Sequence, residues 1–374
     1  MNAIASSRRT FLIATLSAAG GLAIGFTPFR ARAASAIAGA PWDLPDVAEA
    51  TEVGPWVEID PDNSVLIRIA KQEMGQGVFT SMAMIIAEEL ECDWAKVRVE
   101  YASANRSVSH DSLYGSMGTG GSSSVRRSRE MLQLAGATAR ERLIAAAAQR
   151  WGVAPTACTV ANGQVMHQAS GRSLTFGDVA GAAAAATLAN PPKIKSPDQY
   201  KLLGTSVPRF DVKVKTTGEA QFGIDTRVPG MFYASVSACP VFGGTLASAD
   251  ESAIAGRRGI KQVVKLPDAV AVVADSFWRA KQALADLPIT WNEGEAAKTS
   301  SEEFKAEYRA ALDGPAANAR RDGDVATAMA GAAKKVEALY EAPHLAHATM
   351  EPLNCTAHVR ADGHVDIWMG TQAP

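Results

Sequence analysis

Two glycine-rich loops, each placed between a strand-like and a helix-like segment, constrain the fold of this chain more than any other feature. The first is QEMGQGVFT at residues 72–80, and the second is GSMGTGGSSS at residues 115–124. A glycine loop at the start of a helix presents unpaired backbone N–H groups where the helix dipole also favours negative charge. Either loop alone is weak evidence, but together they predict that one large anionic ligand is bound by both.

The segments around these loops have the periodicity of a mixed helix and sheet domain. Two strands joined at a Pro-Asp-Asn turn are expected over residues 56–70, a helix over 80–90 and a further strand over 97–101. A long helix is expected over residues 125–150, ended by Trp151 and Gly152. An alanine-rich stretch and two prolines follow, so we place a domain boundary between Asn190 and Lys201.

The rest of the chain predicts a second domain and then an unfinished sheet. Strands are expected over residues 231–238, 269–274 and 287–292, with a helix over 276–286. Residues 296–334 contain few large apolar side chains and form a connecting segment. Further strands are expected over 335–340, 354–359 and 364–369, and they should leave an exposed apolar edge. The fold class is therefore α+β with several domains.

The first 34 residues have the pattern of a twin-arginine export signal. Arg8 and Arg9 stand directly before an apolar stretch over residues 11–26, and an A-x-A cleavage site follows near Ala33. The stretch is broken by glycines and falls short of the roughly 20 apolar residues of a membrane-spanning helix. We expect removal of residues 1–34 and a periplasmic protein, with an uncleaved anchor as the alternative. Because this route moves folded proteins, it also implies a cofactor that is inserted before export.

Charge and cysteine usage exclude several classes of partner. The chain has 37 basic and 39 acidic residues and no long basic block, so nucleic acid is not an expected partner. No two of its four cysteines form a C-x-x-C pair for zinc or an iron–sulfur cluster. We expect ordinary buried thiols, because the chain would fold before export, with one or two disulfides as the alternative. No metal site is expected, because five of the six histidines lack the spacing of zinc ligands. These five are His110, His167, His344, His358 and His364.

Three arginines at the start of the long helix give a further indication of an anion. Arg126, Arg127 and Arg129 stand in the first turn, where each positive charge costs about 0.3 to 1 kcal/mol when exposed. An anion bound at the second loop would remove this conflict, whereas the alternative is that the arginines point into solvent. Neither loop has the Gly-Lys-Ser/Thr of a nucleotide-triphosphate site or the acidic residue of a nicotinamide site, so those ligands are not expected.

Several motifs together resemble the xanthine oxidase and aldehyde oxidase family of molybdenum hydroxylases. They are QEMGQGVFT at 72–80, AEEL at 87–90, GSMGTGGSSS at 115–124, LGTSVPRFD at 203–211, TGEA at 217–220, DTRVPGM at 225–231, HATMEP at 347–352 and WMGTQ at 368–372. The first loop precedes the other motifs, an order that resembles the exported branch of isoquinoline 1-oxidoreductase beta subunits. The resemblance covers nearly the whole chain after the signal.

The resemblance implies roles for residues in both loops and in one later motif. In relatives, the first loop contacts the pterin and its molybdenum end, here Gly75, Gln76 and Gly77. The second loop binds molybdopterin cytosine dinucleotide through backbone and hydroxyl groups, here Ser116, Met117, Gly118, Thr119 and Gly120. His347 and Glu351 fall in a segment that lies near the molybdenum and the substrate in relatives, with a purely structural role as the alternative.

The resemblance also implies a domain plan. It assigns residues 40–195 to a cofactor-binding domain, 200–295 to an a/b hammerhead domain, 296–334 to the connecting segment and 335–374 to the start of a second, truncated cofactor-binding domain. A small subunit with 2Fe-2S clusters would accept the electrons, and a cytochrome c is a candidate final acceptor. The substrate would be an N-heteroaromatic compound or an aldehyde, oxidised with water-derived oxygen.

Two features of the family are missing from these 374 residues. The chain has no Gly-Gly-x-Phe-Gly-Gly loop and no candidate for the general-base glutamate, which relatives carry near the end of a chain about twice as long. The catalytic residues are therefore unknown, and we expect the N-terminal half of a large subunit, inactive until a second polypeptide supplies the rest. The alternatives are a non-catalytic remnant and a periplasmic anion-binding or scaffold protein.

Overall fold

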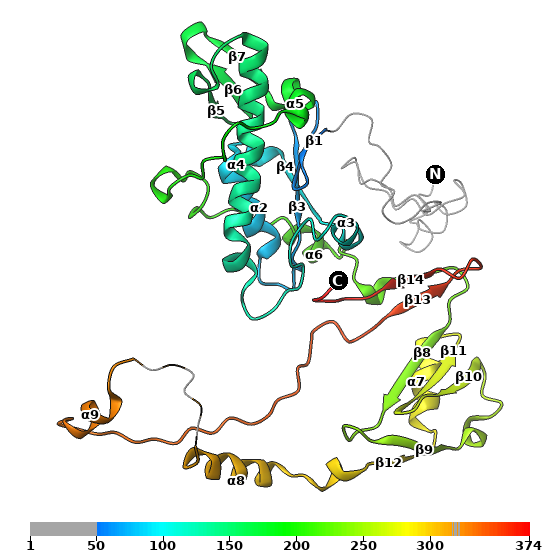
Figure 1. Cartoon of the computed structure of the whole chain (residues 1–374). Coiled ribbons are helices and arrows are strands. Elements are labelled where there is room, and N and C mark those ends of the chain that lie inside the picture. The colour runs from blue at the N-terminus through cyan, green and yellow to red at the C-terminus, as the bar shows by residue number, and fades with distance from the viewer. Residues whose placement is uncertain (1–50, 316, 318–319, 321) are drawn as a thin grey trace, which may run out of the picture. The chain divides into compact units, whose positions relative to one another are not determined.

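The computed structural model describes residues 51–374 except 316, 318, 319 and 321, so the expected export signal lies outside the described residues. The described residues divide into two compact units, one formed by the chain up to Ala220 with Thr371–Pro374 and the other by Gln221–Gly370 (Figure 1). Among the helices of the described ranges, none combines the length and the apolar composition of a membrane span.

A four-stranded sheet with the order β1-β2-β3-β4 forms the centre of the first unit. Its strands are β1 (Thr51–Gly54), β2 (Val57–Ile59), β3 (Val65–Ile69) and β4 (Val97–Tyr101). The first three pair antiparallel, whereas β4 lies parallel to β3 because helix α2 (Val78–Leu90) crosses between them. The expected hairpin, helix and strand are all present, and Asn63 supplies the left-handed turn residue of the hairpin at φ 67°.

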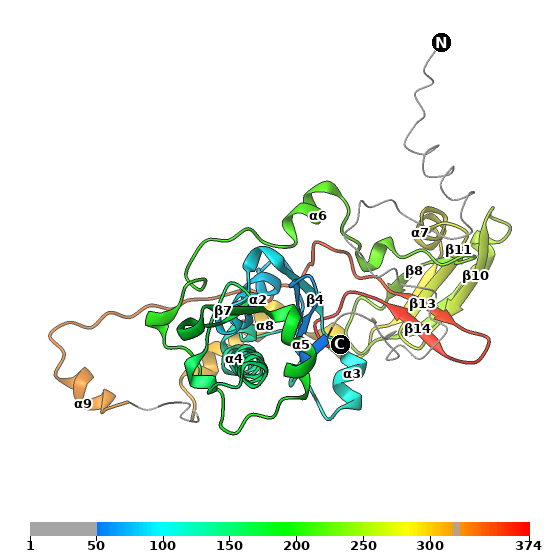
Figure 2. The ribbon, with the colours of Figure 1, turned by 90° about the horizontal axis from the view of Figure 1, so that it is seen from above.

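Helix α4 (Ser124–Trp151) packs beside α2, and Figure 2 looks nearly along its axis. It ends at Trp151 and is capped by Gly152 in the left-handed conformation, at the position where the sequence predicted the helix to end. Helix α5 (Phe176–Ala185) covers β1 and α4. The unit is completed by helix α3 (Ala104–Ser109) and a small antiparallel sheet of β5 (Thr159–Ala161), β6 (Gln164–His167) and β7 (Arg172–Thr175). Ile67, Met82 and Leu132 are fully buried in the resulting core.

The first unit extends further along the chain than the sequence suggested. The expected boundary lies between Asn190 and Lys201, but the residues up to Ala220, including helix α6 (Val212–Thr217), belong to the first unit. Alanines and prolines marked the end of α5, not the end of the domain. The segment after α5 stays on the first unit because buried carboxylates of α2 bind its backbone.

The second unit contains a sheet of order β10-β11-β8 covered by helix α7, together with a pair β12-β9. Its elements are β8 (Tyr233–Ala238), β9 (Thr245–Ala249), β10 (Ile260–Lys265), β11 (Ala269–Ala274), α7 (Phe277–Ala285) and β12 (Ile289–Asn292). Val270 and Val272 of β11 are fully buried in its core. The expected strands over 231–238, 269–274 and 287–292 and the expected helix are present as β8, β11, β12 and α7, whereas β9 and β10 were not expected. Both units mix helices and sheets as the α+β class predicts.

The last part of the second unit differs from the prediction in one strand. Helices α8 (Ser301–Leu312) and α9 (Val325–Ala330) occupy the expected connecting segment. The expected strand over residues 335–340 does not form, because no strand among the described residues pairs with it and all six residues are exposed. The two later strands do form, as the hairpin of β13 (Thr356–Val359) and β14 (Val365–Trp368), in which Val359, Val365 and Ile367 are exposed.

All four cysteines lie within the described residues and remain free thiols. Cys158 is buried and Cys92 and Cys239 are half-buried, but Cys355 is exposed. The expectation of buried thiols is therefore wrong for Cys355, which precedes the two-stranded β13-β14 hairpin and has no core to enter.

Candidate functional site

The first glycine loop forms the start of α2, as expected, but its amides already have an acceptor. Gly77 is the N-terminal cap of the helix, with φ 85°. The carboxylate of Glu73 accepts hydrogen bonds from the N–H groups of Gly75 at 2.7 Å, Gly77 at 2.9 Å and Phe79 at 3.1 Å. The helix N-terminus that was expected to bind an external anion is therefore satisfied by a side chain of the loop itself.

Arg209 holds this internal carboxylate in place from the segment that follows α5. Its guanidinium lies 3.2 Å from Glu73 Oε1 and donates to the carbonyl oxygen of Gly75 at 2.9 Å. The side chain of Glu73 is only 3% exposed. Gln76 folds back on the same loop, because its amide nitrogen donates to the carbonyl of Gln72 and its oxygen accepts from the N–H of Met74. The expected cofactor residues Gly75 and Gln76 are exposed, and their loop is closed by its own hydrogen bonds.

The second glycine loop is tied to the start of the first one. Lys71 donates through Nζ to the carbonyls of Ser116 and Gly118. Thr119 Oγ1 accepts from the N–H of Gln72 at 2.9 Å, so the two loops adjoin. Thr119 also exchanges two hydrogen bonds with Gln372, at 2.8 and 2.9 Å.

A pocket of about 580 Å³ opens beside the second loop. It is lined by Lys71, Gly115, Ser116, Gly118, Thr119, Gly120, Ser123, Arg127, Ser128, Met131, Gln372 and Ala373. Four of the five expected residues of this loop line it, whereas Met117 is buried in the core. The lining contains two cationic side chains and no carboxylate. This volume is within the range of small-molecule and cofactor sites.

The two cations of the pocket, Lys71 and Arg127, differ in burial. Lys71 is 6% exposed, and its burial together with the nearby charge of Arg127 lowers the pKa of its ammonium. Arg127 is exposed at the start of α4 and is the one arginine of the three expected candidates that lines the pocket. Arg129 instead donates to the hydroxyl of Tyr200 at 3.2 Å.

His347 and Glu351, the candidates from the later motif, belong to the second unit and do not line this pocket. His347 is exposed. Glu351 accepts a hydrogen bond from Asn354 at 3.1 Å and a longer one from the N–H of Ile224. Across residues 51–374 apart from the four omitted ones, no group of three or more His, Cys, Asp or Glu side chains is placed to hold a metal ion.

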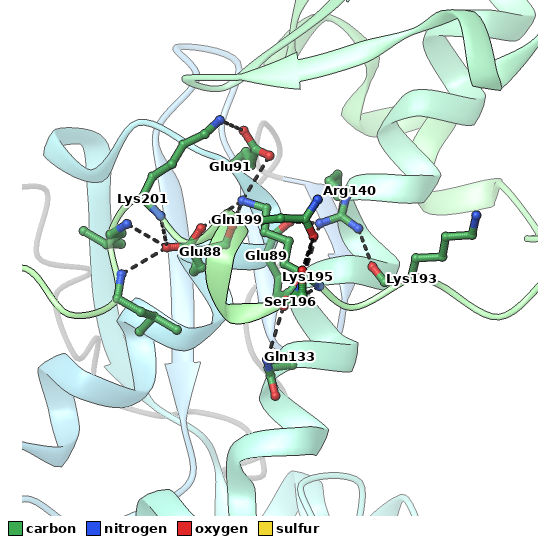
Figure 3. Close-up of polar contacts among 12 residues, drawn as sticks. Glu88, Glu89, Glu91, Gln133, Arg140, Lys193, Lys195, Ser196, Gln199 and Lys201 are labelled. Atoms are coloured by element: carbon green, nitrogen blue, oxygen red, sulfur yellow. Dashed lines mark hydrogen bonds and ion pairs between the residues drawn. The ribbon is translucent and has the colours of Figure 1, made fainter.

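The AEEL motif at the end of α2 has a role that the sequence did not suggest. Figure 3 shows Glu88 and Glu89 among donors from the segment after α5. Glu88 accepts from the backbone N–H groups of Lys201, Leu202 and Leu203, and Glu89 accepts from that of Lys195. Acidic residues oppose the dipole at a helix C-terminus, so their presence there could have signalled a specific partner.

Comparison with known proteins places the chain in a family. The molybdopterin cofactor-binding domain matches residues 17–226, which include both glycine loops, and a second match to a molybdopterin cofactor-binding domain covers residues 310–374. The first match extends beyond the expected interval of 40–195, and the second begins inside the expected connecting segment.

Three curated relatives cover most of this chain. The beta subunit of the isoquinoline 1-oxidoreductase of Brevundimonas diminuta is 31% identical over 98% of the chain and 52% of the relative. The membrane-bound aldehyde dehydrogenase [pyrroloquinoline-quinone] of Gluconacetobacter polyoxogenes is 31% identical over 98% of the chain and 48% of the relative. A subunit of the nicotinate dehydrogenase of Pseudomonas putida is 29% identical over 86% of the chain and 27% of the relative.

The chain belongs to the molybdopterin cofactor-binding domain family and is homologous to molybdenum-binding subunits of the xanthine oxidase family. It spans about half the length of the first two relatives. The pocket fits the phosphate-bearing part of such a cofactor, because it combines a glycine loop, a buried ammonium and a guanidinium with no carboxylate in its lining.

Proposed function

We propose that this chain contributes the binding site for molybdopterin cytosine dinucleotide in a molybdenum hydroxylase that oxidises an N-heteroaromatic compound or an aldehyde. The observation that supports this most is the cationic pocket beside the second glycine loop, which lies within the matched residues 17–226. The names of the relatives include an isoquinoline oxidoreductase, an aldehyde dehydrogenase and a nicotinate dehydrogenase, which together give the two substrate classes.

The pocket's own residues would bind and orient the cofactor. Ser116, Gly118 and Gly120 provide the backbone and hydroxyl groups of the loop, and Lys71 and Arg127 provide positive charge. When bound, the molybdenum cofactor supplies the transfer of water-derived oxygen to the substrate and takes up two electrons. A small subunit with 2Fe-2S clusters would receive these electrons, with a cytochrome c as the candidate next acceptor.

A second polypeptide is part of this proposal. The chain spans about half the length of the first two relatives, and the general base and the rest of the substrate pocket would be supplied by the part of such a protein that it does not cover. The a/b hammerhead assignment of the second unit and the location of His347 and Glu351 near the substrate belong to the same proposal. The chain alone would then bind the cofactor only weakly and would not turn over.

Cofactor content tests the proposal directly. The full chain is co-produced with the small subunit and the second polypeptide in a host that makes the cofactor. Molybdenum is then measured by mass spectrometry, the pterin by fluorescence after oxidation, and the nucleotide by release of cytidine monophosphate. We expect all three in equal amounts. Detection of a quinone in their place would favour pyrroloquinoline quinone, which the name of one relative includes. The absence of any organic cofactor would contradict the proposal and favour a non-catalytic remnant or a scaffold.

Two variants of Gly118 make the same experiment specific to the pocket. A Cβ at Gly118 would meet nothing closer than the Gln372 carbonyl at 3.9 Å, so Gly118→Ala should fold and retain the cofactor. Gly118→Asp adds a carboxylate to a pocket that has none, and it should lose most of the molybdenum because the new charge repels phosphate. Equal molybdenum content in both variants would place the cofactor elsewhere.

Export to the periplasm by the twin-arginine route remains a separate part of the proposal. The paired Arg8 and Arg9 support it. Replacement of both by lysine should leave the full-length precursor in the cytoplasm, whereas the unchanged chain should appear in the periplasmic fraction without its first 34 residues or so. Equal periplasmic amounts of the two chains would contradict this route.

A further inference from the structure

We propose that Lys71 and Arg127 form a dedicated site for a phosphoryl group beside the second glycine loop. Of the two glycine loops, only the second then has an anion site that a ligand can fill. The inference deepens the proposed function and rests on the same pocket, but it concerns two side chains that neither the loop motif nor the family match singles out. It assigns the phosphate or pyrophosphate part of the ligand to the second loop.

The burial of Lys71 is the first observation. The residue as a whole is 6% exposed and, among the described residues, its ammonium forms no ion pair with a carboxylate. It donates to two carbonyl oxygens of the second loop, which satisfies two of its three protons but leaves the positive charge without a counterion. A buried charge is normally paired, so this ammonium is suited to bind an anion that enters the pocket.

Arg127 adds a second positive charge to the same pocket. The repulsion between it and Lys71 is one cause of the lowered pKa of the Lys71 ammonium, so the two charges lie close enough to destabilise each other. Arg127 also opposes the dipole at the start of α4. A doubly charged phosphoryl group between the two side chains would relieve all three unfavourable interactions at once.

The first loop provides the contrast. Its amides at Gly75, Gly77 and Phe79 are bound by the carboxylate of Glu73, and Arg209 neutralises that carboxylate. An external phosphate would have to displace a side chain that is only 3% exposed. The first loop is therefore a closed anion site, and the second loop is an open one.

Arg126 and Arg127 provide a matched pair of variants. Both are exposed at the start of α4, but only Arg127 lines the pocket. The full chain is produced in a host that cannot make the cofactor and is titrated with inorganic pyrophosphate by calorimetry and by thermal shift. We expect binding to the unchanged chain, a loss of affinity of about fivefold or more for Arg127→Met, and no change for Arg126→Met.

Lys71→Met tests the buried charge in the same titration. Its affinity for pyrophosphate should fall by about tenfold or more, and the exposed Lys213→Met is its control. If Lys71→Met does not fold, the Arg127 and Arg126 pair decides alone. No binding to the unchanged chain, or equal losses for Arg127→Met and Arg126→Met, would overturn the inference.

A second measurement distinguishes a phosphoryl group of the cofactor from that of a free phosphate compound. In the co-produced complex, Arg127→Met should lower the molybdenum and pterin content together if the group belongs to the cofactor. If pyrophosphate binding depends on Arg127 but the cofactor content does not, the site takes a free phosphate compound and the proposed function still stands. If the cofactor is absent from the unchanged complex but pyrophosphate binds, the proposed function fails and the phosphoryl site stands.

Discussion

The ammonium of Lys195 lies 2.9 Å from the carboxylate of Glu88, and both side chains are almost completely buried, with 9% and 1% of their surfaces exposed. They join the end of α2 to the segment that follows α5, more than a hundred residues later. The same carboxylate accepts three backbone N–H groups from that segment. This attachment keeps residues up to Ala220, and with them Arg209, on the first unit.

Removal of the charge of Glu88 should destabilise the first unit strongly. Glu88→Gln keeps the shape of the side chain but leaves Lys195 with Glu91 as its remaining carboxylate partner. It also places an amide N–H₂ group, a donor, against either Lys195 or the N–H groups of the segment. Breaking one side of a buried pair in this way costs about 3 kcal/mol of unfolding free energy, to be measured by urea denaturation. The exposed Glu130→Gln should change it by less than about 0.5 kcal/mol. Similar values for the two variants would show that Glu88 contributes nothing specific.

The same carboxylate makes stability depend on pH in the acidic range. Burial by itself raises the pKa of Glu88, but the hydrogen bonds from Lys195 and from three backbone amides outweigh it and lower the pKa below that of the unfolded chain. The unfolded state therefore binds the proton more readily, so the stabilisation is present above about pH 5 and is lost as the pH falls through the lowered pKa.

Denaturation in urea at several values between pH 7 and pH 4 checks this dependence. The unchanged chain should lose stability toward pH 4. Asp211, whose pKa is also lowered, should add to this loss. The loss should be smaller in Glu88→Gln, which has no proton to gain at this position. Parallel pH profiles for the two chains would assign the acid sensitivity to other carboxylates.

The fold of the first unit was predictable where it depends on local patterns. Alternation gave the strands around the turn at residues 61–63, and Gly152 marked the end of the long helix. The boundary at Ala220 was not predictable, because it depends on side chains of α2 that bind backbone groups far along the chain. The strand expected over residues 335–340 had the right alternation, but a strand also needs a partner, and alternation carries no information about one.

Part of the candidate site was predictable for the same reason. The second loop followed from glycine spacing, and a group of three arginines that includes Arg127 followed from charges that oppose a helix dipole. Lys71 was missed because it precedes the first loop yet lies against the second. Glu73 was missed because a carboxylate four residues before a helix cap has no obvious capping signature. It nevertheless accepts hydrogen bonds from the amides at the start of that helix.

Glu73 should control the order of the first loop. In Glu73→Ala the N–H groups of Gly75, Gly77 and Phe79 lose their acceptor, and their hydrogen exchange should become about tenfold faster or more. Exchange in the rest of α2 should change little. Glu219→Ala, an exposed carboxylate of the same unit, is the control and should leave all three amides unchanged. Unaltered exchange in Glu73→Ala would mean that the loop holds its shape without the internal anion.

Gly136 should be essential for the contact between α2 and α4. A Cβ at this position would lie 2.4 Å from the carbonyl oxygen of Ile86 and 2.8 Å from Cβ of Glu89, so Gly136→Ala forces the two helices apart. Alanine normally stabilises a helix by up to about 1 kcal/mol relative to glycine. Here the sign should reverse, with a loss of about 2 kcal/mol or more from overpacking.

Gly181→Ala in α5 is the matched substitution, since nothing lies within 4 Å of its added Cβ. It should follow the ordinary propensity and stabilise the chain by about 0.5 to 1 kcal/mol in urea denaturation. Opposite signs for two identical substitutions in neighbouring helices would show that α2 and α4 are in direct backbone contact at Gly136. Stabilisation by both alanines would instead require the helices to be further apart. The network of Glu88 and Glu89 at the end of α2 would then be looser, since Glu89 is one of the two residues that Gly136 approaches.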